Sequence, residues 1–161
     1  AESVQLCFPK ARHWVSARHW AHAHRPTLRD RASFRPVDFA ALEDGGMLQR
    51  VADDAAAEIP DLSWQVSNGH TPGQLLPVFA GGEQGRDLLF VGDLLPTTAH
   101  LSPAWVMAYD LEPVTTLNER LALYERMRAR DMLIAFPHDP EIGVAGLHFE
   151  KNRPSVGEVL Q

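Results

Sequence analysis

The segment that most constrains this chain is residues 67–74, which read SNGHTPGQ. β-rich residues precede it at 64–66 and an apolar run follows it at 75–79, so the segment is predicted to be a tight turn between two strands. His70 stands between a glycine and a Thr-Pro-Gly sequence, and glycine and proline are the residues that fix turn conformations most strongly. Because little backbone freedom remains there, the imidazole is expected to point in one direction.

Two later positions repeat this arrangement. Asp93 ends the apolar run 88–92, and His138 ends the apolar run 132–137. In open α/β sheets, ligands bind beyond the carboxyl ends of the strands, and imidazole and carboxylate groups suit zinc, iron(II) or manganese(II). We therefore predict that His70, Asp93 and His138 are metal ligands that meet at one pocket rim. Taken singly, they have simpler interpretations as surface histidines and a turn-forming aspartate.

The composition excludes several classes of protein. With 161 residues, 45% hydrophobic and 22% charged, the chain is predicted to form a single domain over residues 1–161. A net charge of −6 without a long basic run argues against nucleic acid as a partner. The sequence contains no run of about 18 apolar residues, so no membrane span is predicted. Cys7 is the only cysteine, which excludes an internal disulfide and favours the cytoplasm. The first residues show no secretory signal and are expected to lie part-way through a longer protein.

Helical and strand patterns alternate along the chain, which predicts an α/β (or α+β) fold. The longest helix is expected over 117–129, with Thr116 and Glu119 as a capping box and an apolar face formed by Leu117, Leu121 and Tyr124. Shorter helices are expected over 15–23, over 36–42 and from Ser102. Strands are expected over 6–8, 47–51, 58–62, 75–79, 87–91, 132–136 and 143–149, and the residues from 153 are expected to be a tail.

The motifs around the three predicted ligands resemble, in their order, the later metal motifs of the metallo-β-lactamase-fold hydrolases. These motifs are GHTPG at 69–73, FVGD at 90–93 and FPHD at 136–139. Three further segments resemble the lactonase- and phosphotriesterase-like branch of that superfamily: FPKA at 8–11, RASF at 31–34 and AYDLEP at 108–113. The resemblance implies an αββα sandwich, of which this chain would be the carboxyl-terminal half with flanking helices.

By this resemblance, His70 ligates one metal ion, Asp93 bridges two, and His138 ligates the other. Zinc is the expected cofactor, as two divalent ions, with iron or manganese as alternatives. The implied activity is hydrolysis of a small ester, lactone or related small molecule by metal-activated hydroxide. The resemblance leaves the catalytic residues other than the metal ligands unassigned.

The part of the sequence that follows the Asp93 loop contains three candidates for binding the substrate. We expect His100, Trp105 and Tyr109 to line a pocket, and the alternative is ordinary packing or surface exposure. Acyl-homoserine lactonases have a tyrosine three residues after the bridging aspartate, where this chain has Pro96. This difference argues against that narrow activity without excluding other lactones.

One motif of the family is absent from this sequence. The His-x-His-x-Asp-His motif should precede the segments above, and only His22 and His24 have its first spacing, followed by arginine and proline. We predict that these two histidines are surface residues. The chain thus resembles a truncated domain that lacks its amino-terminal half, and it is expected to be poorly active or inactive alone. An uncovered apolar face would favour a homo-oligomer or association with the missing half.

Two alternatives share the fold but differ in function. One is an iron enzyme of the persulfide dioxygenase branch, which uses a single iron and oxygen. The other is a non-catalytic half-fold that acts as an oligomeric or partner subunit. The metal content and the hydrolytic activity of the protein distinguish these alternatives from the two-metal hydrolase.

Overall fold

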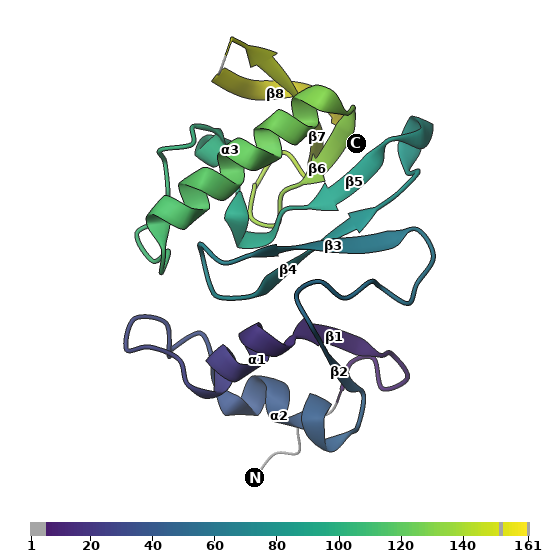
Figure 1. The fold of residues 1–161 in the computed structure, drawn as a ribbon, viewed down its shortest axis with the longest axis vertical. Helices are drawn as coiled ribbons and strands as arrows, with labels where there is room; N and C mark the ends of the chain where they lie inside the picture. The colour runs from purple at the N-terminus through teal and green to yellow at the C-terminus, as the bar shows by residue number, and fades with distance from the viewer. Residues whose placement is uncertain (1–5, 152, 161) are drawn as a thin grey trace. The chain divides into compact units, whose positions relative to one another are not determined.

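The computed structural model describes residues 6–151 and 153–160. The chain divides into two compact units, one up to Ala55 and the other from Ala56 (Figure 1). That residues 1–161 form one domain stays a prediction. Within the described residues, none of the helices has the length and apolar character needed to cross a membrane.

The first unit combines two short parallel strands with two helices. Its elements are β1 (His13–Ser16), α1 (Ala17–His24), α2 (Pro36–Asp44) and β2 (Leu48–Val51). The helix α1 begins after Ser16, whose side chain accepts a hydrogen bond from the His19 backbone N–H at 2.9 Å, as expected of an N-terminal cap. Both helices and β2 confirm the sequence prediction. The predicted strand over 6–8 is wrong, because these residues form a bend that ends in a turn with Ala11 N bonded to Phe8 O.

His22 corrects a second prediction in this unit, because most of its side chain is covered rather than exposed on the surface. The side chain is 11% exposed, and its Nε2 lies 2.5 Å from Oδ2 of Asp30. The other carboxylate oxygen of Asp30 accepts hydrogen bonds from the N–H and the hydroxyl of Thr27, both at 2.7 Å. His24 is 44% exposed, as predicted. Burial alone would raise the pKa of Asp30, but the bonds to His22 and Thr27 outweigh it and lower that pKa.

This lowered pKa predicts how the stability of the first unit depends on pH. A carboxylate whose pKa is lower in the folded state stabilises the fold above its unfolded-state pKa of about 4, and the contribution is lost as the pH falls below that value. We expect Asp30→Asn to reduce the free energy of unfolding by about 1–2 kcal/mol at pH 7, and we expect this loss to become smaller as the pH falls through the lowered pKa of Asp30. Urea unfolding followed by tryptophan fluorescence measures this difference. Asp44→Asn, which changes the same charge at an exposed position, is the control, and equal effects of the two changes would contradict the prediction.

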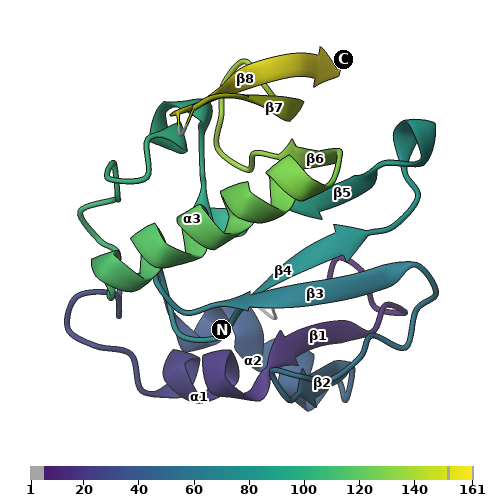
Figure 2. The same cartoon turned by 45° about the horizontal axis from the view of Figure 1, so that its top comes forward.

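The second unit is built on a six-stranded mixed sheet (Figure 2). Its strands are β3 (Leu62–Ser67), β4 (Gln74–Phe79), β5 (Asp87–Phe90), β6 (Met132–Ala135), β7 (Val144–Glu150) and β8 (Arg153–Leu160), in that spatial order. Neighbouring strands are antiparallel except for β5 and β6, which are parallel. A parallel pair needs a crossover connection, and α3 (Pro113–Ala129) provides it.

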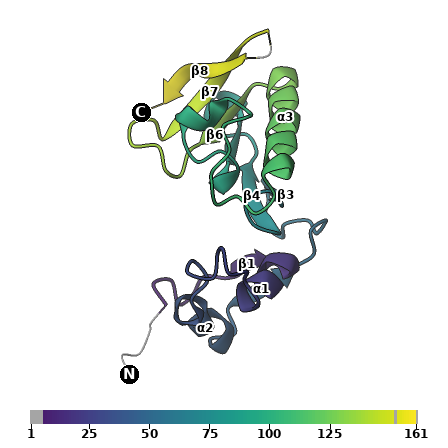
Figure 3. The same ribbon diagram turned by 90° about the vertical axis from the view of Figure 1, so that its left-hand side faces the viewer.

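The helix α3 runs along one face of this sheet (Figure 3). The core between them contains apolar side chains of the central strands and of the helix, among them Leu76, Leu89, Leu123, Tyr124 and Ile134. Burial raises the pKa of Tyr124 to about 12, and its hydroxyl donates a hydrogen bond to Leu101 O at 2.7 Å. The predicted apolar face of this helix is partly wrong, because Leu121 is 45% exposed while Arg120 is fully buried.

Three sequence predictions for this unit are corrected by the structure. Residues 58–61 form bends and turns, and the strand begins at Leu62. The predicted tail is β8, which pairs with β7 along the edge of the sheet. Ser102 lies in a turn after the short 3-10 helix Thr98–Leu101 and starts no helix. The hairpin of β4 and β5, the helix–strand order of α3 and β6, and the strand β7 confirm the predicted mixed α/β architecture.

Candidate metal centre

The turn that carries His70 joins β3 to β4, as predicted. These strands pair so that Ser67 stands opposite Gln74, and the residues between them form the turn. The Asn68 side-chain oxygen accepts a hydrogen bond from Gly73 N at 3.0 Å, an example of an asparagine that substitutes for a backbone partner in a turn. Gly73 has a φ of 78°, a conformation that favours glycine.

A carboxylate from α3 holds the other side of this turn. Glu119 accepts hydrogen bonds from the Ser67 hydroxyl at 2.7 Å, from Asn68 N at 2.8 Å and from Gly69 N at 3.3 Å. The predicted capping box of Thr116 and Glu119 is therefore wrong, because the helix begins a turn earlier, at Pro113. Glu119 instead accepts hydrogen bonds from residues about 50 positions earlier in the sequence. Two of these donors are backbone N–H groups of the turn, which therefore have a partner outside the strand pairing.

Removing this carboxylate is expected to loosen the turn. We expect Glu119→Ala to lower the free energy of unfolding by about 3 kcal/mol, because it leaves three donors without their acceptor. Glu119→Gln, which keeps one acceptor oxygen, should cost roughly half as much. Urea unfolding measures both values. Glu125→Ala removes an exposed carboxylate from the same helix and serves as the control; a loss as large as that of Glu119→Ala would contradict the role of Glu119.

Asp93 follows β5 and lies in the 3-10 helix Gly92–Leu94. Gly92 has a φ of 48°, and a Cβ atom at this position would lie 3.0 Å from the Leu76 side chain and 3.1 Å from that of Gln74. A glycine here thus allows both the backbone conformation and the close approach. Gln74 donates a hydrogen bond from its side-chain nitrogen to Oδ2 of Asp93 at 3.0 Å, which orients the carboxylate.

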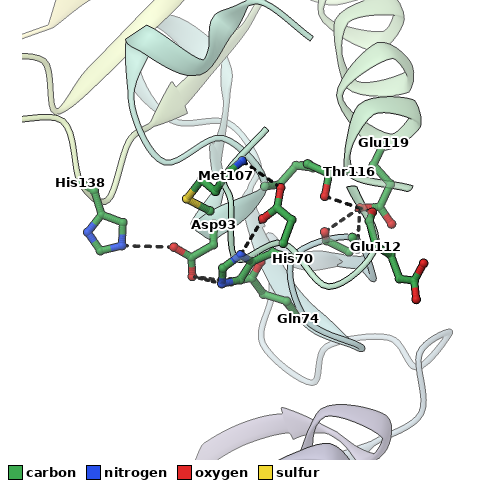
Figure 4. Close-up of polar contacts among 12 residues, drawn as sticks. His70, Gln74, Asp93, Met107, Glu112, Thr116, Glu119 and His138 are labelled. Carbon is green, nitrogen blue, oxygen red and sulfur yellow. Dashed lines mark hydrogen bonds and ion pairs between the residues drawn. The ribbon is translucent and has the colours of Figure 1, made fainter. Parts of the chain in front are cut away.

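The three predicted ligands come together around this carboxylate (Figure 4). His70 Nε2 lies 3.7 Å from Oδ2 of Asp93, and His138 Nε2 lies 3.2 Å from Oδ1. The three side chains are 17%, 31% and 64% exposed, respectively, for His70, Asp93 and His138. The two imidazoles thus face opposite oxygens of one accessible carboxylate. Their role as metal ligands stays a prediction.

A buried second carboxylate orients His70. Asp110, whose side chain is inaccessible to solvent, has its Oδ1 2.9 Å from His70 Nδ1, and its Oδ2 accepts a hydrogen bond from Met107 N at 3.2 Å. An Nδ1–H donated to Asp110 leaves the lone pair on Nε2, which faces Asp93. Carboxylate–histidine pairs of this kind fix the tautomer of metal-binding histidines. The AYDLEP motif contained Asp110, but the sequence assigned it no role.

His138 is positioned through the backbone and through its neighbour. Its N–H donates to Pro96 O at 3.1 Å. Asp139 accepts hydrogen bonds from the N–H and hydroxyl of Thr98, at 2.8 and 2.6 Å, and from the N–H groups of Glu141 and Ile142, at 3.0 and 2.9 Å. Burial would raise the pKa of Asp139, but these bonds hold it well below the usual range. The loop after β6 is thus fixed to the loop after Asp93.

The three predicted ligands form two donor pairs that share Asp93, and they do not form one complete ligand set. Across residues 6–151 and 153–160, no group of three or more His, Cys, Asp or Glu side chains is arranged to hold a single ion. His70 with one oxygen of Asp93, and His138 with the other oxygen, form two pairs. A carboxylate that uses both oxygens in this way is suited to bridging. Each pair alone is an incomplete ligand set, because zinc in catalytic sites is usually held by three protein ligands.

The three candidate substrate-binding residues have different environments. The Tyr109 ring contacts His70 edge-on, with 6.2 Å between ring centroids, and is 61% exposed. Trp105 is 62% exposed. His100 Nδ1 lies 2.8 Å from the Thr97 hydroxyl, and burial, assisted by the charge of Arg120, lowers the pKa of His100. Of the three, Tyr109 is the one in ring contact with a predicted ligand, and a role for them in substrate binding stays a prediction.

Arg120 on α3, which the sequence analysis did not identify, is hydrogen-bonded to the loop that follows Asp93. The fully buried guanidinium donates hydrogen bonds to Leu94 O at 2.7 Å, to Trp105 O at 2.6 Å and to His100 O at 3.4 Å. Fully buried arginines are rare unless they are paired, and here Nε and Nη1 have carbonyl partners, whereas Nη2 has none among the described residues. The signal in the sequence was the position of Arg120 four residues before Tyr124, which places both on one helix face.

Comparisons with solved structures find proteins of the same fold. A probable metal-dependent hydrolase from Staphylococcus aureus matches with 22% sequence identity and a TM-score of 0.76, over 96% of this chain and 55% of its own. The β-lactamase superfamily hydrolase AbOPH matches with 18% identity and a TM-score of 0.78, over 96% and 57%. The dizinc quorum-quenching lactonase AidC, in complex with a product, matches with 17% identity and a TM-score of 0.74, over 98% and 58%.

These similarities confirm the predicted fold, which is part of a metallo-β-lactamase-type αββα sandwich. The chain spans between 55% and 58% of the length of the three proteins. No protein-family model and no curated protein matches the sequence. At identities of 17–22%, the likeness establishes the fold, and the activity has to be argued from the site.

Proposed function

We propose that His70, Asp93 and His138 are ligands of a centre of two divalent metal ions in a hydrolase that acts on a small ester, lactone or related compound. One observation carries the proposal: the two imidazoles face opposite oxygens of the same carboxylate, at 3.7 and 3.2 Å. The similarity in fold to metal-dependent hydrolases and to a dizinc lactonase supports it. Zinc is the proposed metal because imidazole and carboxylate ligands suit it.

When bound, such ions lower the pKa of water and stabilise the negative charge that develops on the oxygen of the reacting group. The residues of the chain prepare the site for this chemistry. Asp110 holds the tautomer of His70 that leaves Nε2 free to bind a metal, and Gln74 fixes the plane of the Asp93 carboxylate. Because these groups are already oriented, little reorganisation is needed when the ligands act.

The proposed substrate class follows from the surroundings of the centre. Tyr109 stands edge-on to His70 with most of its ring exposed, and such a ring can pack against an apolar acyl or alkoxy group. Pro96 replaces the tyrosine expected in acyl-homoserine lactonases. We therefore favour simple esters and other lactones over acyl-homoserine lactones.

Metal loading combined with a hydrolysis assay tests the proposal. The protein is stripped of metal, loaded separately with zinc, manganese and iron(II), and assayed on an aryl ester, a γ-lactone and a phosphotriester. We expect zinc to bind weakly, because each position has two protein ligands, and any metal-dependent hydrolysis to be lost in His138→Ala. The control is His148→Ala, which changes an exposed histidine on β7.

The outcomes separate the proposal from the alternatives. One bound iron together with oxygen consumption would favour the dioxygenase. No metal bound, or metal binding unchanged in His138→Ala, would reject the proposed centre and favour a non-catalytic role for the chain.

A further inference from the structure

The loop that follows Asp93, residues 94–105, is held at three points by one side chain of α3. The guanidinium of Arg120 donates hydrogen bonds at 2.7, 3.4 and 2.6 Å to three backbone carbonyls of this loop, those of Leu94, His100 and Trp105. The first and the third of these residues are the two ends of the loop. The bonds therefore fix the separation of its ends as well as the position of its middle.

Packing alone does not explain why a charged side chain occupies this position. Arg120 is fully buried, and among the described residues no carboxylate forms an ion pair with it. Burial lowers the pKa of Arg120, and Tyr124 and Asp110 oppose this effect only in part. An apolar side chain of similar length would fill the same space without the cost of burying a charge. The hydrogen bonds to the loop are what an arginine adds here.

The part of the loop that Arg120 closes also carries the contacts that hold His138. Pro96 O accepts a hydrogen bond from His138 N at 3.1 Å, and the N–H and the hydroxyl of Thr98 donate to Asp139 at 2.8 and 2.6 Å. Both contacts lie between the first two carbonyls that Arg120 binds. A shift of this part of the loop would therefore move the backbone of His138, and with it the imidazole that faces the shared carboxylate.

His70, on the other side of that carboxylate, is held by different contacts. Glu119 accepts hydrogen bonds from two backbone N–H groups of the turn, at 2.8 and 3.3 Å. Backbone N–H groups of residues 111–112 donate to His70 O at 3.2 Å and to Gly69 O at 2.8 Å. These bonds involve neither Arg120 nor the loop that follows Asp93. The two imidazoles are thus positioned by separate sets of contacts.

We propose that Arg120 is a positioning residue for the His138 side of the proposed metal centre and acts through the loop that follows Asp93. The inference rests on the proposed function, because it assigns part of the geometry of that centre to a residue that is not itself a ligand. Loss of Arg120 should let His138 move away from Oδ1 of Asp93 and should leave His70 in place. Adjacent residues of α3 then act on opposite halves of the centre, Glu119 on one and Arg120 on the other.

Amide hydrogen exchange of the metal-free protein, followed by NMR, tests this role without a metal. We expect Arg120→Met to speed the exchange of the Thr98 and His138 N–H groups about tenfold or more. The N–H groups of residues 68–69 should exchange as they do in the unchanged protein. Glu119→Ala should show the opposite pattern, with faster exchange at residues 68–69 alone. Slow exchange of the amides of β6 in both variants would show that the sheet remains folded.

Two further variants separate positioning from a general loss of stability. Arg120→Lys keeps the charge and can still donate to loop carbonyls, so it should restore part of the protection at Thr98 and His138. It also gives the same comparison between the two sides if Arg120→Met does not fold. Arg128→Met removes the same charge from an exposed position of the same helix and should exchange as the unchanged protein does. Equal acceleration on both sides of the centre in the Arg120 variants, or acceleration on neither, would overturn the proposal.

Calorimetric titration with zinc connects this role to the proposed centre. At concentrations at which the unchanged protein binds two ions, Arg120→Met should bind one, because the His138 position is lost and the His70 position is kept. Two ions bound by Arg120→Met with the affinities of the unchanged protein would overturn the proposal. Absence of zinc binding by the unchanged protein would instead reject the proposed metal centre, and the exchange pattern would still show whether Arg120 holds His138.

Discussion

Replacing Asp93 with alanine should reduce the zinc affinity of the chain more than any other single change. Asp93 offers one oxygen to the His70 side and the other to the His138 side, so its loss removes a ligand from both metal positions. We expect the affinity to fall by at least about 100-fold, since loss of an outer-shell partner alone typically costs 10–100-fold. Calorimetric titration with zinc, after removal of bound metal, gives the affinity and the number of ions.

The histidine variants make this prediction specific. His70→Ala and His138→Ala should each weaken one metal position and leave the other unchanged. Each variant should therefore bind one zinc ion at concentrations at which the unchanged protein binds two. Asp131→Ala, which removes a carboxylate that is 78% exposed, should bind zinc as the unchanged protein does. Full binding by Asp93→Ala, or identical losses in all four variants, would contradict the shared carboxylate.

The change Gly69→Ala is expected to have the largest effect on stability. A Cβ atom at this position would lie 2.3 Å from the hydroxyl of Thr116, 2.4 Å from its backbone nitrogen and 2.5 Å from its Cα. Two of these three atoms belong to the backbone of α3, so no change of side-chain rotamer relieves the overlap. The turn and the helix must separate, and this also breaks the bond from Glu112 N to Gly69 O, which is 2.8 Å long.

We expect this substitution to lower the free energy of unfolding by about 3 kcal/mol or more, at or above the upper end of the usual range for overpacking. Urea unfolding measures the loss. Gly143→Ala provides the control, because a Cβ atom there meets nothing within 4 Å. The double variant Gly69→Ala with Thr116→Ala, which removes the overlapping hydroxyl, should remain destabilised, since the backbone atoms stay in place. Recovery of stability in the double variant would show that the overlap involves the side chain alone.

The sequence predicted those parts of the fold that depend on neighbouring residues. The turn around His70, the hairpin of β4 and β5 and the order of α3 and β6 follow from local glycines, prolines and hydrophobic runs. The meeting of His70, Asp93 and His138 could be predicted as well, because it requires only that three strand ends lie at one edge of a sheet.

The rest depended on contacts that no local pattern encodes. Glu119 has the spacing of a helix cap, yet its partners are about 50 residues away. Asp110 and His70 are separated by 40 positions. The residues from 153 were predicted to be a tail, but they form β8, which pairs with β7 after the turn at Lys151, where φ is 55°. In each case tertiary contacts decided between conformations that the local sequence allowed.

The helix α3 reaches the proposed centre from two sides. Glu119 accepts a hydrogen bond from the turn that carries His70, and Arg120 donates one to the backbone just after Asp93. Two adjacent residues of α3 therefore hold the loops that carry the predicted ligands His70 and Asp93, which follow different strands. Amide hydrogen exchange in α3 and zinc affinity should consequently change in parallel: a variant that lets the helix open more often would also let the two loops drift apart, without any ligand being altered.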